Sequence, residues 1–246
     1  MSKNYQQVAL VTGAARGIGE ATVEKFVEEG INVVATDILP EIKHLNKADV
    51  ITLTHDVSKA ESWASILEDV KSRFGRLDIL VNNAGIGTLP DVEEEEETGW
   101  MEMLDINAKS IWLGIKAAIP LMRSNHSGSI VNVSSIFGAS GGFGKSAAYH
   151  ASKGVVSAVT RNAAIRYASE NIRVNAVSPG FVKVAREEKT IEKAGDQMSQ
   201  EILFRTPMKR WADPSEIASA INFLAGKDAT YITGVELFVD GGWMAT

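Results

Sequence analysis

The chain has 246 residues, of which 45% are hydrophobic and 23% are charged, a composition typical of a globular domain and unlike that of a disordered chain. It carries 31 acidic and 25 basic side chains, and a net charge of −6 gives no general attraction to nucleic acid or to anionic membranes. Cysteine is absent, which excludes disulfides, a thiolate nucleophile and zinc sites built on thiolates.

Short apolar runs alternate with longer stretches of helical periodicity along the whole chain. The expected strands are Val8–Thr12, Val33–Thr36, Val50–Leu53, Ile79–Val81, Ile130–Val133, Ile172–Val177 and Val235–Val239. The expected helices are Gly17–Gly30, Ser58–Phe74, Trp100–Met122, Ala148–Ser169 and one that is capped by Asp213. Such alternation predicts a seven-stranded parallel sheet with helices on both faces. With right-handed crossovers, the fold class is α/β: a doubly wound, Rossmann-type single domain over residues 1–246.

Two stretches interrupt this alternation. Glu93–Glu97 is a run of five carboxylates before a helix, where negative charge suits the positive end of the helix dipole; we interpret it as a solvated helix start. Phe181–Lys209 is longer than an ordinary connection, and we expect a substrate-binding lobe at about residues 181–209.

A glycine-rich turn joins the first expected strand to the first expected helix. The glycines of Thr12–Gly19 follow the pattern G-x-x-x-G-x-G, which allows a tight turn and lets a pyrophosphate approach the free N–H groups of the helix. Asp37 ends the second strand, 18 residues after Gly19, where its carboxylate can accept hydrogen bonds from ribose hydroxyls and repel a 2′-phosphate. The pattern favours NAD over NADP, although Arg16 beside the turn could accept a 2′-phosphate.

Tyr149 and Lys153 are four residues apart in an expected helix, so both project from the same face. A nearby ammonium favours phenolate over phenol, and a tyrosine tuned in this way can act as general acid or base on an alcohol or carbonyl oxygen. His150 projects about 100° around the helix from Tyr149, and we interpret it as structural.

Taken together, these motifs resemble the short-chain dehydrogenase/reductase family, in its branch of about 250 residues, over essentially the whole chain. The resemblance rests on the order and spacing of motifs at Thr12–Gly19, Asn82–Gly85, Asp105–Asn107, Val131–Ser135, Tyr149–Lys153, Ser178–Gly180 and Val239–Gly242.

The resemblance implies roles for individual residues. The catalytic set would be Asn107, Ser135, Tyr149 and Lys153: Tyr149 as acid/base, Ser135 as holder of the substrate oxygen, Lys153 as partner of Tyr149 and of the nicotinamide ribose, and Asn107 as anchor of a water in a proton path. The cofactor-binding set would be Gly13, Arg16, Gly17, Ile18, Gly19, Asp37, Asp56, Val57, Asn83, Ala84, Gly85, Tyr149, Lys153, Pro179, Gly180 and Val182.

Two positions depart from the family pattern. The interval from Ser135 to Tyr149 is 14 residues, one more than usual; the glycine-rich Gly138–Gly144 loop can absorb the extra residue, which leaves Ser134 as the weaker rival for the catalytic serine. Val184 stands where the family often has a threonine that binds the nicotinamide carboxamide, and a valine cannot make that bond.

The expected substrate is an uncharged, mainly apolar ketone or secondary alcohol, recognised by Ser135, Phe137, Phe143, Tyr149 and Val184. Ile86, Leu89, Ile136 and Val182 are further apolar candidates for the same wall. Basic residues of the lobe (Lys183, Arg186, Lys189 and Lys193) could instead meet an anionic substrate or an acyl-carrier protein, although acidic residues interleave with them.

Three functions remain open. The leading interpretation is an NAD(H)-dependent alcohol dehydrogenase or ketone reductase; the others are a redox-neutral lyase or epimerase on the same fold and a non-catalytic cofactor-sensing protein. No metal, nucleic acid or membrane partner is expected, because the four histidines lack metal-ligand spacing and no apolar run approaches the ~20 residues of a membrane span. We expect a cytoplasmic homotetramer or homodimer, since no signal peptide is visible and the family associates through its long helices.

Overall fold

The computed structural model describes residues 6–87, 90–184 and 196–246, except for the side chain of residue 196. Seven parallel strands form one sheet in the order β3-β2-β1-β4-β5-β6-β7. Their bounds are β1 Val8–Thr12, β2 Asn32–Asp37, β3 Val50–Thr54, β4 Ile79–Asn82, β5 Gly128–Val133, β6 Ile172–Pro179 and β7 Glu236–Val239. The predicted doubly wound parallel sheet is therefore confirmed.

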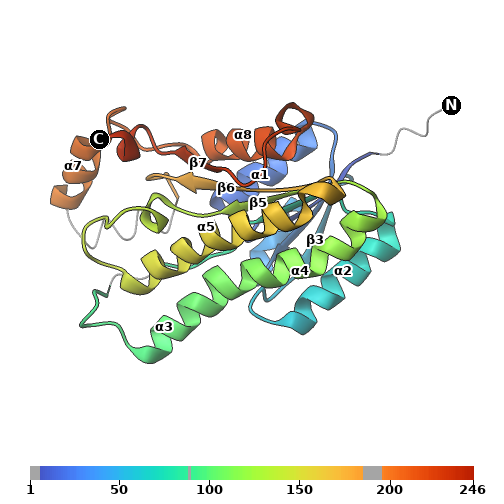
Figure 1. Cartoon of the computed structure of the whole chain (residues 1–246), viewed down its shortest axis with the longest axis horizontal. Helices are drawn as coiled ribbons and strands as arrows, with labels where there is room; N and C mark the ends of the chain where they lie inside the picture. Colours follow the sequence, from blue (N-terminus) through green and yellow to red (C-terminus); the bar gives the residue numbers. More distant parts are fainter. Residues whose placement is uncertain (1–5, 88–89, 185–195) are drawn as a thin grey trace.

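Helices cover both faces of this sheet (Figure 1). Helices α1 (Gly17–Glu28) and α8 (Pro214–Ala225) pack on one face, and α2 (Ala60–Phe74), α4 (Ser110–Ser124) and α5 (Ala147–Tyr167) pack on the other. The other α-helices among the described residues are α3 (Glu97–Leu104) and α7 (Asp196–Arg205). Short helical turns lie at Pro40–Leu45, Ile136–Gly138, Ala168–Glu170, Lys227–Ala229 and Trp243–Ala245.

The continuous apolar strands are explained by burial on both faces of the sheet. Along β1, Ala9 and Val11 pack into the cluster under α1 and α8, whereas Val8 and Leu10 pack into the cluster under α2, α4 and α5. Because successive side chains of a strand point to opposite faces, a strand between two helical layers needs apolar residues at every position.

One expected helix differs from the structure. The stretch 100–122 was expected to be one regular helix, but α3 and α4 are joined by a π-helical turn at Asp105–Lys109. A π-turn inserts one residue into the helix without changing its polarity pattern, so hydrophobic periodicity does not reveal it.

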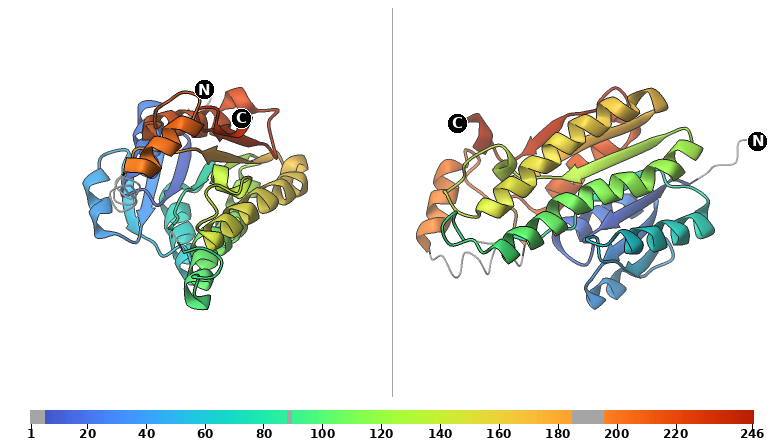
Figure 2. Two further views of the ribbon diagram at one scale, coloured as in Figure 1. Left: turned by 90° about the vertical axis from the view of Figure 1, so that its left-hand side faces the viewer. Right: turned by 60° about the horizontal axis from the view of Figure 1, so that its bottom comes forward.

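One helix also begins later than expected. Helix α2 begins at Ala60, two residues later than expected, because the Asp56 carboxylate accepts hydrogen bonds from the Ser58 N–H (3.0 Å) and hydroxyl (2.7 Å) and holds that turn out of the helix. Within the expected lobe at 181–209, the described part includes α7, and α7 lies beside the C-terminal segment (Figure 1, Figure 2).

The acidic run lies at the surface. Glu93, Glu94, Glu96 and Glu97 are exposed, α3 begins at Glu97, and Lys145 approaches the neighbouring Asp91 at 3.7 Å. Among the described residues, no helix is long and apolar enough to cross a membrane and no group of three or more potential metal ligands occurs.

The sheet order places the candidate site. The chain winds outward in both directions from β1 and β4, so the crossovers leave these neighbouring strands on opposite sides. This divergence opens a crevice at the carboxyl ends of β1 and β4, where ligands bind in doubly wound sheets.

Candidate active site

A cavity of about 970 Å³ lies at the carboxyl ends of the strands. Its walls come from the glycine turn, the turn after β4, the segment after β5, the start of α5 and the segment after β6. All predicted site residues except Gly19 and Asn107 line it.

The glycine turn has the backbone that close packing requires. Gly13 and Gly17 both have positive φ angles, 63° and 64°. A Cβ on Gly19 would lie 2.2 Å from the Gly13 carbonyl oxygen, so Gly19 packs against the turn beneath the cavity surface. The N-cap residue of α1, Arg16, makes no side-chain capping bond, and the first N–H groups of the helix remain available to an anion.

Asp37 lies at the edge of the cavity, half-buried at the end of β2. Its Oδ2 accepts a hydrogen bond from the Ala15 N–H (3.0 Å), and its Oδ1 accepts one from the Leu39 N–H (3.0 Å). A carboxylate has about four acceptor sites, so each oxygen retains capacity for a ribose hydroxyl. Together with the uncapped start of α1, this arrangement fits a dinucleotide. Asp56 and Val57 line the same end of the cavity.

The turn after β4 is fastened to the glycine turn. The Asn83 amide donates to the carbonyl oxygens of Thr12 and Gly13 (both 2.9 Å), and the Thr12 hydroxyl accepts the N–H of Asn83 at 3.0 Å. A Cβ on Gly13 would lie 2.7 Å from the Ala84 Cα, so only glycine allows this approach. Asn83 and Ala84 therefore shape one wall of the cavity as well as lining it.

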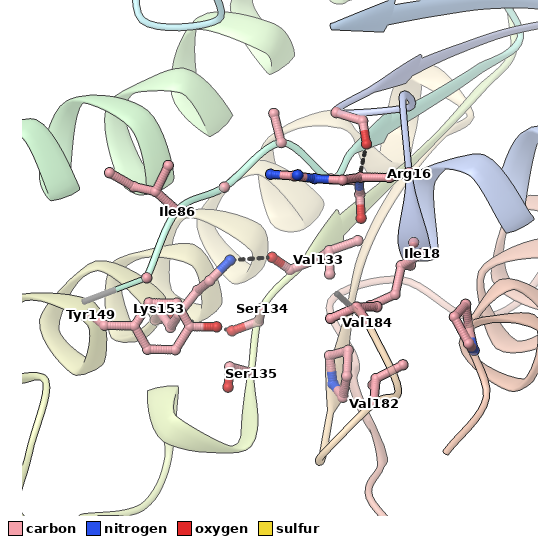
Figure 3. A pocket seen from close by; sticks show the side chains of 18 of the residues that line it. Arg16, Ile18, Ile86, Val133, Ser134, Ser135, Tyr149, Lys153, Val182 and Val184 are labelled. Atoms are coloured by element: carbon pink, nitrogen blue, oxygen red, sulfur yellow. Dashed lines mark hydrogen bonds between the residues drawn. The ribbon is translucent and has the colours of Figure 1, made fainter. Parts of the chain in front are cut away.

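Tyr149 and Lys153 face the cavity from the first turns of α5 (Figure 3). The Lys153 ammonium lies 5.7 Å from the centroid of the Tyr149 ring, and it donates a hydrogen bond of 2.9 Å to the Val133 carbonyl oxygen. Lys153 is 4% exposed. A buried ammonium beside the ring favours the phenolate form of tyrosine.

Ser134 and Ser135 follow β5 beside Tyr149, and the two hydroxyls have different partners (Figure 3). The Ser134 hydroxyl donates to the Lys153 backbone carbonyl at 3.2 Å, so it ties the strand to α5. The Ser135 oxygen accepts the Phe137 N–H at 3.2 Å, which leaves its own proton for a further partner. This difference favours Ser135 over Ser134 as the serine that holds a substrate oxygen.

Asn107 is buried in the π-turn and does not line the cavity. Its Oδ1 accepts the Ile86 N–H (2.8 Å), while its amide donates to the Ile86 carbonyl (2.9 Å) and the Ser152 hydroxyl (3.2 Å). A Cβ on Gly85 would lie 3.2 Å from Asn107 Oδ1 and 3.7 Å from Lys153 Nζ. Asn107 therefore fixes the turn after β4 against α5, with Gly85 above the ammonium.

The segment after β6 forms the opposite wall. Pro179, Gly180, Val182 and Val184 line the cavity, and a Cβ on Gly17 would lie 3.0 Å from Val184 Cγ1. Val184 therefore packs over the glycine turn with an apolar side chain. Leu89, Arg186, Lys189 and Lys193, named above as substrate candidates, lie outside the described residues.

An aromatic wall lies at the far end of the cavity from Asp37. Phe137 packs edge-on to Tyr149 (6.3 Å between centroids) and to Phe181 (5.8 Å), and Phe181 packs on Trp211 (5.3 Å). Phe143 and Ile86 also line this part, together with Met198 and Ile202 from α7. Sequence reasoning found Phe137, Phe143 and Ile86 but missed Phe181, Trp211 and the α7 residues. No local pattern in the sequence marks these residues as parts of one wall.

His150 has a structural environment. Its ring stacks on Phe137 at 4.7 Å, and its Nδ1 lies 2.9 Å from the Ser146 carbonyl oxygen, one turn back in the chain. Because that oxygen can only accept, Nδ1 carries the proton, and the ring lines the cavity beside Phe137.

Comparison with known proteins identifies the family. The family model described as enoyl-(acyl carrier protein) reductase matches residues 13–244. The chain is 37% identical over 252 residues to cyclopentanol dehydrogenase of Comamonas sp. (strain NCIMB 9872), with 100% of both chains covered. It is a short-chain dehydrogenase/reductase.

Other members of the family agree with this assignment. The chain is 38% identical over 245 residues to 3-oxoacyl-[acyl-carrier-protein] reductase of Thermotoga maritima, covering 96% of this chain and 97% of that one. The crystal structure of levodione reductase superposes with a TM-score of 0.92 at 30% identity and 98% coverage of each chain. This short-chain dehydrogenase/reductase is therefore an oxidoreductase of the alcohol dehydrogenase and ketone reductase type, which uses a nicotinamide cofactor.

Proposed function

We propose that this short-chain dehydrogenase/reductase interconverts an uncharged, mainly apolar secondary alcohol and its ketone with NAD(H). One observation carries the proposal. A single cavity has the glycine turn and Asp37 at one end, the Tyr149, Lys153 and Ser135 group in the middle and an aromatic wall at the other end. A dinucleotide laid from Asp37 towards Lys153 would bring its nicotinamide beside Tyr149, next to the space lined by apolar rings.

When bound, the cofactor supplies or accepts the hydride. In the direction of ketone reduction, Tyr149 donates its phenolic proton to the substrate oxygen while Ser135 donates a hydrogen bond to the same oxygen. Lys153 stabilises the resulting phenolate and holds the nicotinamide ribose. Tyr149 is reprotonated through Lys153 and a water at the π-turn. Because the Asn107 side chain is hydrogen-bonded to Ile86 and Ser152, the backbone carbonyl of Asn107 holds this water.

Cofactor preference follows from the charge at the end of β2. Asp37 is held in place by two backbone N–H groups, so it cannot easily turn away from a 2′-phosphate. The remaining cofactor contacts in the proposal are the first N–H groups of α1 to the pyrophosphate, Asp56 and Val57 at the adenine, and Pro179, Gly180 and Val182 at the nicotinamide.

Within this proposal the substrate is a cyclic ketone. The walls beyond Tyr149 consist of Phe137, Phe143 and Phe181 with apolar residues of α7, so recognition rests on shape and apolar area. Two of the three relatives above are named for cyclic substrates, cyclopentanol and levodione. An acyl-carrier substrate has less support, because Lys183, the described cation of the lobe that lines the cavity beside Val184, is paired with Asp213 at 3.1 Å.

The test is a panel of cyclic and linear ketones and alcohols, assayed with NAD(H) and NADP(H) through the absorbance of the reduced nicotinamide. We expect the highest kcat/KM for neutral cyclic ketones with NADH. Conversion of a substrate without net change in nicotinamide absorbance would favour the redox-neutral alternative. A matched ketone that carries a carboxylate and reacts faster than its neutral analogue would refute the apolar substrate class.

The proposal includes assembly through the long helices into a homodimer or homotetramer. Trp112 on α4 exposes 49% of its surface and Ile165 on α5 exposes 84%, which leaves large apolar side chains on the outer faces of both helices. Sedimentation of the purified protein tests this assembly, and a monomer at micromolar concentration would refute it.

A further inference from the structure

A cluster of side chains at the aromatic wall of the cavity joins four segments that are far apart in the chain. Arg205 ends α7, Phe143 lies in the loop before α5, Phe181 follows β6, and Trp243 follows β7 only three residues from the C-terminus. Phe143 and Phe181 line the cavity, whereas Arg205 and Trp243 do not.

The Arg205 guanidinium makes three contacts in this cluster. Its central carbon lies 5.1 Å from the Phe143 ring centroid and 4.8 Å from the Trp243 ring centroid, and one nitrogen donates to the Gly142 carbonyl oxygen at 3.2 Å. A planar guanidinium can contact two rings and donate a hydrogen bond at the same time, which an ammonium does less well. The remaining partner, Glu201 on the preceding turn, is 3.9 Å away.

Trp243 supports the wall from behind. Its ring centroid lies 5.7 Å from that of Phe143 and 5.2 Å from that of Phe181, and its side chain is 6% exposed. The loop that carries Phe143 is held on its other side as well, because a Cβ on Gly142 would lie 2.7 Å from Phe137 Cε1. Arg205 therefore packs against Phe143, and Trp243 packs against both rings of the wall.

We propose that Arg205 and Trp243 are positioning residues that hold Phe143 and Phe181 in the aromatic wall, where the two rings supply the apolar contact that a wide ketone needs. The inference rests on the proposed ketone reductase function. Arg205 is well placed for such a role, since 42% of its side chain is exposed and its removal leaves no buried charge unpaired. A small ketone held by Tyr149 and Ser135 does not depend on the outer rings, whereas a wide ketone does.

The experiment compares cyclopentanone with a bicyclic decalone in wild type, Arg205→Ala, Arg205→Lys and the control Glu201→Ala. In Arg205→Ala we expect KM for the decalone to rise by up to about tenfold, the limit set by the free energy of the two partly exposed cation–π contacts that hold the wall in place. The kcat values, KM for cyclopentanone and the NADH dissociation constant should stay within about twofold. Arg205→Lys should recover part of the loss, and Glu201→Ala should equal wild type, because it removes the ion-pair partner but leaves the ring contacts.

A second variant separates positioning from folding. Trp243→Leu keeps an apolar residue behind the wall but removes the ring, and we expect the same selective rise in KM for the decalone even if the melting temperature falls. The inference is wrong if KM for the decalone is unchanged in Arg205→Ala. It is also wrong if both variants bind the two ketones and NADH more weakly to the same extent.

Failure of the proposed function gives a different result. If wild type neither reduces the two ketones nor binds them, as measured by quenching of tryptophan fluorescence, the inference falls together with that function. If wild type reduces both ketones and Arg205→Ala discriminates between them as wild type does, only the inference falls.

Discussion

Replacing Asp37 tests the electrostatic basis of cofactor choice. The carboxylate is half-buried at the cavity edge, and backbone N–H groups of Ala15 and Leu39 hold both of its oxygens at 3.0 Å. A 2′-phosphate beside the same ribose would stand about 5 Å from it, where two unit charges repel by about 3 kcal/mol at an effective dielectric constant of about 20. Salt screening at this partly exposed site reduces the repulsion to about 2 kcal/mol, or roughly 30-fold.

Asp37→Asn removes the charge and keeps the size of the side chain. One of the two backbone N–H groups then faces an amide NH₂ instead of an acceptor. This lowers the stability of the protein and weakens the binding of both NADH and NADPH. The ratio of kcat/KM for NADH to that for NADPH cancels this shared loss, so the ratio is the quantity to measure. We expect it to fall by roughly 30-fold from wild type to Asp37→Asn.

The double variant Asp37→Ser with Ile38→Arg should go further and invert the preference. Ile38 lines the cavity and is 61% exposed, so an arginine there can meet the phosphate without burying its charge. The reasoning is refuted if wild type prefers NADPH, or if Asp37→Asn keeps the wild-type ratio. Arg16→Ala is the matched control: it should lower activity with NADPH more than with NADH.

Three further predictions concern the catalytic pair, the glycine turn and stability. Tyr149→Phe should lower kcat by at least about 1000-fold and leave the NADH dissociation constant unchanged. Lys153→Ala should lower kcat and also weaken NADH binding. Substantial turnover by Tyr149→Phe would contradict the mechanism. Gly19→Ala should lower NADH affinity, measured by fluorescence titration, at least tenfold, because its Cβ would lie 2.2 Å from a carbonyl oxygen, whereas Gly141→Ala meets nothing within 4 Å and should bind NADH normally. Burial lowers the pKa of His55 to about 4, so the unfolded chain binds the extra proton between about pH 6.5 and 4, and the free energy of unfolding should fall by about 3 kcal/mol as pH falls through that window. Urea unfolding at several pH values measures this slope, and His55→Gln should flatten it; an unchanged slope would exclude His55 as its source.

The sequence by itself determined the sheet, its helical layers and the local motifs of the candidate site. Strands β1, β2 and β4 are apolar at nearly every position because they are buried on both faces, so their positions could be predicted to within one or two residues. The glycine turn and the pair Tyr149 and Lys153 could also be placed, because a strand-to-helix turn and a one-turn spacing in a helix are local properties of the chain.

Only the tertiary structure decided which neighbours these residues have. The choice between Ser134 and Ser135 depends on a backbone carbonyl of α5, and the π-turn at Asn107 depends on contacts with the turn after β4. Neither partner is near in sequence, so no local pattern encodes the contact.

The aromatic wall shows most clearly what local sequence patterns do not predict. Four separate segments contribute to it: Phe143, Phe181, Arg205 and Trp243. From its local sequence, each of these residues would be interpreted as an ordinary loop, helix-end or C-terminal residue. Their common position follows from the sheet order, because β6 and β7 end side by side and bring the segments after them to the same edge of the cavity. A parallel sheet gathers at one edge residues that are distant in the chain, so local motifs such as the glycine turn could be located from sequence, whereas the residues that together form the aromatic wall could not.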